Sequence, residues 1–281
     1  MEKSLKKYFP IFILPTVLSY LIAFFIPLIL GIYLSFTQFR TVTDAKFVGL
    51  KNYINIFTTG DNFFHSFIFT VLFAIVAVVS VNLIAFALAL VLTGNVIGKN
   101  GFRTVFFLPN LIGGIVLGYI WQLIINGVLY NYGYTITSNS VYGFWGLVIL
   151  TNWQMIGYMM IIYIAGLMSV PTELIEAAKV DGASNTRILF NIKIPSVMPS
   201  VTVCLFLTIT NSFKLFDQNL ALTAGAPGNQ TAMMALDIYQ TFYGRSGYEG
   251  VGQAKAVIFS LIVAGIALLQ LYLTRRKEFD S

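Results

Sequence analysis

The sequence has 281 residues and a formal net charge of +6, but only 10% of its residues are charged and 57% are apolar. Soluble domains carry about 25% charged residues, and a soluble globule of this size could not cover its surface with so few. Between Arg103 and Glu173 there is no Asp, Glu, Lys or Arg. The composition therefore predicts a membrane protein and excludes a soluble domain. It also excludes nucleic-acid binding, because the basic residues form no face interleaved with aromatic side chains.

Six segments are long and apolar enough to cross a bilayer, which takes about 20 residues in a helix. The first contains Pro10, Pro15 and Pro27, which a membrane helix tolerates when neighbouring helices satisfy the freed backbone groups. It is too long for a signal peptide and no small-x-small cleavage site follows it, so we expect an uncleaved helix. The predicted fold is an all-α membrane protein, a single domain over residues 1–281 with six transmembrane helices. The six spans lie at about residues 8–36, 63–94, 104–125, 144–168, 195–213 and 256–274.

The distribution of Lys and Arg predicts which side of the membrane each connection faces. The two termini, the 95–103 loop and the 173–193 segment together hold eleven of these residues, and the remaining connections hold six. Cytoplasmic segments carry the excess of positive charge. Because six spans place both termini on one side, we expect both termini and a loop at residues 170–195 to be cytoplasmic.

Two segments on the opposite side have recognisable patterns. Leu50, Tyr53, Ile54 and Phe57 recur at helical spacing, which predicts a short amphipathic helix on the outer surface. Residues 223–229 are a turn-forming cluster of Gly, Pro and Asn, and a loop is expected there.

Small and isolated residues inside the spans indicate packing rather than chemistry. Gly114 and Gly118 are spaced for close helix approach, with hinge motion near Pro109 as an alternative that the sequence does not separate from it. Cys204 is the only cysteine and reads as a small residue in a packed helix. His65 has no carboxylate or second ligand beside it. We therefore expect no metal site and no catalytic residues.

The 173–193 segment is a polar island between two apolar stretches. Pro171 and Glu173 predict a helix start, and Glu173 and Glu176 complement the positive end of the helix dipole. Gly182 fits a left-handed helix end. A second short helix, from about Ser184 to Ile192, should end before Ile194 and Pro195, because the residue before a proline is pushed out of helical geometry. The pattern predicts two short helices meeting at an angle, which a soluble partner could grip; an ordinary re-entrant or surface loop is the alternative.

This island resembles the EAA loop of the membrane subunits of ATP-binding-cassette (ABC) importers. The family usually has a leucine where this chain has Ile194. The residues that carry the resemblance are Glu176-Ala177-Ala178-x3-Gly182-x9-Ile192-x-Ile194-Pro195.

Three further segments are similar to the carbohydrate branch of that family, so the resemblance covers nearly the whole chain. They are residues 47–53, residues 103–109, and residues 223–229, where Ala224 and Ala226 replace two glycines of the family pattern. The subgroup that the chain resembles is the first of two different permease subunits in multiple-sugar, maltose and glycerol-phosphate importers, with the type I importer permease fold.

The resemblance implies a transport subunit that is not an enzyme, in the bacterial cytoplasmic membrane. Its partners would be a second homologous permease, two nucleotide-binding ATPase subunits, an extracellular solute-binding protein, a sugar or oligosaccharide, and membrane lipid. The chain itself would bind no cofactor: ATP and Mg would be held by the ATPase, since Gly94-x3-Gly98-Lys99 lacks the spacing of a phosphate-binding loop. The residues expected to couple to the ATPase are Glu173, Glu176, Ala177, Ala178, Asp181, Gly182, Arg187 and Pro195. For Arg187, an ordinary solvated charge on the surface is an equally good interpretation.

Polar side chains of spans four and five are the candidates for the substrate path, where the resemblance also places substrate contacts. Polar groups inside a membrane are costly and are functional candidates by default. A sugar has hydroxyl groups and apolar C–H faces, which amides, hydroxyls and aromatic rings complement. The alternative for each side chain is a hydrogen bond between helices, and for Lys214 a reach to the outer interface. The candidates are Asn152, Trp153, Gln154, Tyr158, Thr208, Asn211, Ser212, Lys214 and Asp217.

A secondary, ion-coupled transporter is the competing hypothesis. It predicts buried carboxylates or unwound helices near the middle of the membrane. The six predicted spans contain no Asp or Glu. This absence disfavours proton coupling, and a membrane-embedded enzyme is disfavoured because no catalytic constellation lies at membrane depth.

Overall fold

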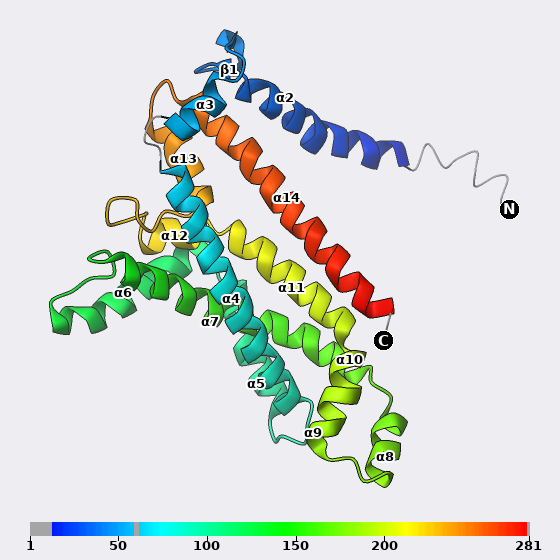
Figure 1. Cartoon of the computed structure of the whole chain (residues 1–281). Coiled ribbons are helices and arrows are strands. Elements are labelled where there is room, and N and C mark those ends of the chain that lie inside the picture. The colour runs from blue at the N-terminus through cyan, green and yellow to red at the C-terminus, as the bar shows by residue number, and fades with distance from the viewer. Residues whose placement is uncertain (1–12, 59–61, 280–281) are drawn as a thin grey trace, which may run out of the picture. The chain divides into compact units, whose positions relative to one another are not determined.

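A computed structural model describes residues 13–58 and 62–279, which are mostly helical (Figure 1). Pro10 and the lysines before it lie outside the described residues. The chain divides into two compact units, one formed by residues up to 63 with 238–260 and the other by residues 64–237 with those from 261 onward. Two short antiparallel strands, β1 (Thr37–Gln38) and β2 (Lys46–Phe47), belong to the first unit.

Five helices of the described residues are long and apolar enough to cross a membrane, or six if one bent pair counts as a single span. Four of the predicted spans, the first, second, fourth and sixth, coincide with such helices, and the third and fifth differ in detail. The five are Ile13–Ser35, Phe63–Leu92, Gly114–Tyr132, Ser140–Met168 and Glu249–Thr274, and the bent pair is Asn185–Ser196 with Met198–Phe213.

The third predicted span, 104–125, is not one continuous helix. It divides into α5 (Lys99–Phe107), a 3-10 turn η3 (Leu108–Leu111) and α6 (Gly114–Leu129). The backbone is extended at Ile112 and Gly113, with ψ of 130° and 140°. Pro109 explains why a continuous helix was the wrong prediction, because it lacks an N–H and its ring clashes with the preceding turn.

The expected end of a helix before Pro195 is also wrong. Ile194 is helical (φ −61°, ψ −48°), and its N–H donates to the carbonyl of Leu189, five residues back. This wider π-helical turn, η5 (Leu189–Lys193), connects α9 (Asn185–Ile188) to α10 (Ile194–Ser196) and makes room for the proline ring. The helix breaks instead at Val197, where it bends by 67° into α11 (Met198–Phe213).

The first span contains the same device. A π-helical turn, η1 (Leu21–Phe25), precedes Pro27 in α2 (Ile26–Ser35), and the Ile26 N–H donates to the carbonyl of Leu21. In both spans an Ile-Pro step follows a five-residue π turn, which lets the helix continue past a residue that cannot donate a hydrogen bond.

The first unit is built around α3 (Lys51–Thr58), which confirms the helix predicted from residues 50–57. Asn52 is buried and donates from its amide to the carbonyls of Ser35 and Thr37. A Cβ at Gly250, in α14 (Glu249–Phe279), would overlap the Thr37 carbonyl and approach the Asn52 amide, so only glycine fits there. The turn η2 (Val42–Asp44) and one end of α13 (Met234–Gly244) also belong to this unit.

The second unit packs around α7 (Ser140–Met168). One apolar cluster joins it to α4 (Phe63–Leu92) and α12 (Asp217–Leu222) through Phe73, Leu147 and Leu222. Another joins it to α4 and α11 through residues such as Met159 and Cys204, which confirms that the cysteine is a buried packing residue.

The glycine pair of the third span packs against α12. A Cβ at Gly114 would lie 2.8 Å from the Cβ of Asp217, and one at Gly118 would lie 2.5 Å from the Cβ of Ala221. The predicted close approach is confirmed.

The turn after α12 is held by buried side chains. Asn219 donates to Thr223 Oγ1 and accepts the N–H of Met233, and Thr231 Oγ1 donates to Thr223 Oγ1. Ala224 has φ of +49°, at a position where the family pattern has glycine. This network confirms the predicted turn and fixes its backbone.

We predict that Gly157→Ala destabilises the protein by about 1–3 kcal/mol through overpacking. A Cβ at Gly157 in α7 would overlap the backbone carbonyl of Phe106 in α5, and backbone cannot move aside as a side chain can. Gly265→Ala in α14 is the matched control, because nothing lies within 4 Å of its added Cβ. Thermal unfolding of the full chain in detergent measures both; equal unfolding temperatures would contradict the packing described here.

Candidate functional site

The first helix of the polar island is α8 (Thr172–Val180), which begins after Pro171 as predicted. Glu173 lies in its first turn and Lys179 in its last turn. Both charges are placed where the helix dipole favours them. Glu173, Glu176 and Ala177 are exposed, and Ala178 is half-buried.

The end of α8 is a Schellman motif centred on Gly182, which has φ of +78°. The Gly182 N–H donates to the Lys179 carbonyl at 3.0 Å, and the Ala183 N–H donates to the Ala178 carbonyl at 2.9 Å. The Asp181 N–H donates to the Ala177 carbonyl at 3.0 Å. The predicted left-handed helix end is therefore confirmed, and the last carbonyls of α8 are satisfied by the turn itself.

The next helix begins directly after this turn. Ser184 caps α9, and its Oγ accepts the N–H of Arg187 at 3.3 Å. Only Asp181, Gly182, Ala183 and Ser184 separate the two helices, and backbone bonds fix three of the four. Figure 1 shows α8 and α9 meeting in a tight corner. We call residues 172–196 the helical corner.

The helical corner exposes apolar side chains, two of which, Val180 and Phe190, sequence reasoning missed. The exposed fraction is 88% for Val180, 61% for Phe190 and 52% for Leu174. Large apolar residues inside a polar island were the signal that could have found them. Asp181, Gly182 and Arg187 are also exposed, whereas Pro195 is half-buried.

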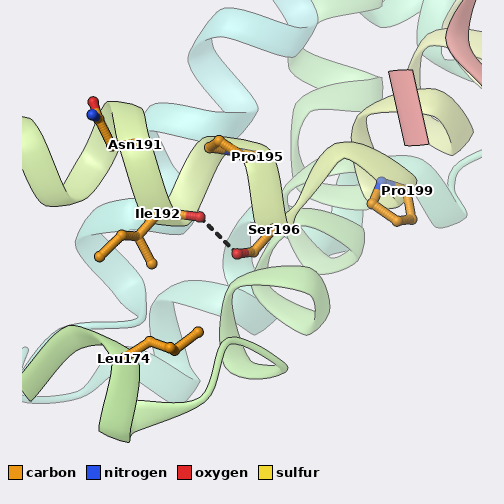
Figure 2. A pocket seen from close by; sticks show the side chains of 6 residues that line it. All are labelled: Leu174, Asn191, Ile192, Pro195, Ser196 and Pro199. Atoms are coloured by element: carbon orange, nitrogen blue, oxygen red, sulfur yellow. Dashed lines mark hydrogen bonds between the residues drawn. The ribbon is translucent and has the colours of Figure 1, made fainter. Parts of the chain in front are cut away.

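A cavity of about 420 Å³ lies between α8 and the helical segments η5, α10 and the start of α11 (Figure 2). Leu174 lines it from α8, and Ser196 lines it while donating from Oγ to the Ile192 carbonyl at 2.7 Å. Pro195 and Pro199 belong to the same wall, so Pro195 shapes the inside of the helical corner rather than its exposed tip.

A second cavity of about 200 Å³ brings together four of the nine substrate-path candidates. It is lined by Gln154 and Tyr158 from α7, and by Asn211 and Lys214 at the end of α11. Amide, hydroxyl and ammonium groups thus face one space, together with the apolar Met155 and Leu215. We call it the amide cavity.

Two residues of the amide cavity were missed from the sequence. Gln218 in α12 donates from Nε2 to Gln154 Oε1 at 2.7 Å, and Asn110 lies in η3. Gln154 in turn donates to the carbonyl of Ile112 at 3.4 Å. Asn110 lies within the predicted third span, so the rule used for spans four and five would have found it there.

The five remaining candidates do not line the amide cavity. Asn152 donates to Ser80 Oγ of α4 at 2.9 Å, and Thr208 Oγ1 accepts from Asn82 Nδ2 at 3.0 Å. Asn82 also accepts the hydroxyl of Tyr163 at 2.7 Å. These are hydrogen bonds between helices, the alternative weighed for every candidate.

Trp153, Ser212 and Asp217 complete that set of five. Trp153 is 43% exposed and packs edge-on against Trp121 with ring centroids 5.6 Å apart. Ser212 is buried in α11, and Asp217 is exposed at the first turn of α12.

Over the ranges 13–58 and 62–279 no group of three His, Cys, Asp or Glu side chains is placed to hold a metal ion.

Residues 89–279, more than half of the chain, match the family described as "binding-protein-dependent transport system inner membrane component". The chain is 48% identical to a probable starch degradation products transport system permease protein of Thermoanaerobacterium thermosulfurigenes, over 96% of this chain and 94% of the relative. It is 28% identical to a multiple sugar-binding transport system permease protein of Streptococcus mutans, over 99% of both chains.

A solved structure shares the fold. It is a chain from the crystal structure of a bacterial ABC transporter involved in the import of the acidic polysaccharide alginate. The TM-score is 0.82 over 98% of both chains, at 20% sequence identity. At this identity the likeness supports the fold alone.

We predict that Gly182→Ala loosens the helical corner and Gly182→Asn does not. The left-handed conformation costs an L-residue with a Cβ about 1–2 kcal/mol, whereas asparagine adopts it more readily. Amide hydrogen exchange over residues 177–188 should be faster in the alanine variant and close to wild type in the asparagine variant. Equal exchange in the two variants would show that the turn does not determine the rigidity of the corner.

Proposed function

Because the chain belongs to the binding-protein-dependent transport system inner membrane component family, whose members are ABC importer permeases, we propose that it forms half of a bacterial carbohydrate translocation path. The observation that carries the proposal is the helical corner, a rigid and exposed element joined to a membrane span. The proposal includes six spans with the bent pair as the fifth, both termini in the cytoplasm, and insertion in the bacterial cytoplasmic membrane.

The substrate class is argued from the amide cavity and from the relatives. Gln154, Asn211 and Gln218 offer donors and acceptors in the pattern that sugar hydroxyls require, and Tyr158 adds a ring for an apolar sugar face. The relative that is 48% identical is named for starch degradation products. These observations support an uncharged oligosaccharide as the substrate, with Lys214 a candidate to orient it.

Coupling would run from the helical corner into the membrane. ATP and Mg would be bound by two copies of a partner ATPase, which would grip α8 at Glu173, Glu176 and the exposed Val180. Displacement of the corner would then move α11 through the 67° bend at Val197. A second permease and an extracytoplasmic solute-binding protein would complete the importer, as the family implies.

The ion-coupled alternative has no support in these findings. The candidate spans from Ile13–Ser35 to Ser140–Met168 contain no Asp or Glu, and the last span has only Glu249, at its first residue. The relatives are named as permease proteins of transport systems.

We predict that Glu176→Ala reduces coupling to the ATPase. In the purified complex with its partner subunits, ATPase activity stimulated by sugar-loaded binding protein should fall about fivefold or more, the effect of losing an interface contact worth over 1 kcal/mol. Lys99→Ala is the control, because Lys99 is a half-buried charge at the start of α5, outside the helical corner. Equal stimulated activity in the two variants would contradict the assignment of Glu176 to docking.

We predict opposite effects for two polar residues of α11. Asn211→Ala should raise the KM for sugar uptake severalfold without changing stability, because Asn211 is exposed in the amide cavity. Thr208→Val should lower the free energy of unfolding by about 1 kcal/mol and leave the KM unchanged, because it removes the partner of Asn82. Uptake kinetics in vesicles and thermal unfolding distinguish the two roles. If the KM rose for Thr208→Val and not for Asn211→Ala, the assignment would be reversed.

A further inference from the structure

Two glycines of α6 leave room for Gln218 of α12. A Cβ at Gly114 would lie 2.9 Å from Gln218 Cδ and 3.0 Å from Gln218 Oε1, and a Cβ at Gly118 would lie 3.3 Å from the Gln218 carbonyl oxygen. The two glycines lie four residues apart, so they share one face of the helix. A larger residue at Gly114 would push the glutamine side chain away from its place in the wall of the amide cavity. The close approach of α6 and α12 therefore determines where Gln218 lies.

Gln218 in turn holds a second glutamine of the same cavity. Its Nε2 donates to Gln154 Oε1 at 2.7 Å, and Gln154 Nε2 donates to the Ile112 carbonyl at 3.4 Å. The first bond joins residues 64 apart in the chain, and the second joins residues 42 apart. We call these two bonds the glutamine relay. It connects α12 to α7, and α7 to the extended break between η3 and α6.

The direction of the glutamine relay follows from hydrogen-bond chemistry. A backbone carbonyl oxygen only accepts, so the Ile112 end of the relay requires the Nε2 of Gln154. The Oε1 of Gln154 then faces Gln218, which must supply its own Nε2 as the donor. An amide bonded on one side alone could turn over and exchange its donor with its acceptor. The long bond to Ile112 thus sets the orientation of the Gln154 amide, and the short bond to Gln218 holds it.

The other amides of the amide cavity are not held in this way. Asn110 and Asn211 line it, and over residues 13–58 and 62–279 their side chains make no hydrogen bond to the protein. Each of these two amides can turn to suit a ligand. The Gln154 amide instead presents its remaining donor and acceptor in one arrangement, because the relay has already oriented it.

We propose that Gln218 is a positioning residue of the sugar site, which orients the Gln154 amide and so lowers the KM for the sugar. The inference rests on the proposed function, because it takes the ligand of the amide cavity to be an oligosaccharide. Orienting a polar side chain during binding costs conformational entropy, and a side chain that is already oriented avoids this cost. A site with a fixed donor and acceptor also rejects a sugar whose hydroxyl does not match them. Gln218 acts on the sugar through Gln154.

The test is sugar uptake by the importer reconstituted with its partner subunits. Gln218→Met removes the donor at nearly constant volume and should raise the KM about fivefold, the effect of one lost hydrogen bond, with the maximal rate unchanged. Gln154→Met should raise the KM at least as much, and adding Gln218→Met to it should raise the KM no further. Gln270→Met is the matched control and should leave the KM unchanged, because Gln270 donates to the Thr202 carbonyl of a neighbouring helix outside the amide cavity.

Amide hydrogen exchange tests the glutamine relay without sugar. In the full chain, residues 110–116 should exchange at least about threefold faster in Gln218→Met than in wild type, because Gln154 no longer holds the Ile112 carbonyl. Gln154→Met should give the same increase, and Gln270→Met none. Unchanged exchange in Gln218→Met would show that Gln218 does not hold Gln154. If Gln218→Met does not fold, Gln218→Ala takes its place, because the shorter side chain introduces no clash.

The uptake measurement separates failure of this inference from failure of the proposed function. A KM raised by Gln154→Met but not by Gln218→Met overturns the positioning role and leaves the sugar site standing. An effect of Gln218→Met that persists undiminished beside Gln154→Met also overturns it, since Gln218 would then contact the sugar directly. Absence of sugar uptake by the wild-type importer contradicts the proposed function, and with it the role of Gln218 in the KM.

Discussion

The pairing of backbone N–H and C=O groups in a medium without water is the constraint on which this structure depends. Proline removes one donor wherever it occurs in a span, and the chain responds in two ways. Ahead of Pro27 and Pro195 the helix widens into a π turn and continues. Beside Pro109 it tightens into a 3-10 turn and becomes extended at Ile112. The Ile112 carbonyl freed by that break accepts a hydrogen bond from Gln154, so a backbone interruption and the amide cavity are built from the same contact.

The polar residues of the spans separate into two populations by the helix face on which they lie. Successive residues of α7 point about 100° apart. Asn152 therefore bonds to α4, Trp153 packs on Trp121, and Gln154 faces the amide cavity. The first arrangement contributes stability and position, whereas the third leaves polar groups available to a ligand. A span with several polar residues in a row therefore uses one of them to hold a neighbouring helix and another to line a cavity.

The helical corner and the amide cavity are connected through α11. Over 16 residues, this helix extends about 24 Å from the bend at Val197 to the cavity residue Lys214 at its far end. It packs closely on α7 at one point, where a Cβ at Gly166 would overlap Ser200 Oγ. The helix α11 thus joins an exposed corner to a polar cavity, and a closely packed helix of this kind deforms little.

The sequence by itself determined the membrane class, the approximate spans and the residues of the helical corner. These follow from local physics: apolar length, helix caps, and the need of Gly182 for a left-handed conformation. It also identified the polar residues worth considering. Only the tertiary structure decided which of them meet, because Gln218 and Asn110 join Gln154 through contacts between segments far apart in the chain. The breaks at Ile112 and Val197 likewise required the structure. A proline in the sequence shows that one backbone hydrogen bond of the helix is missing, but tertiary packing decides where the chain bends.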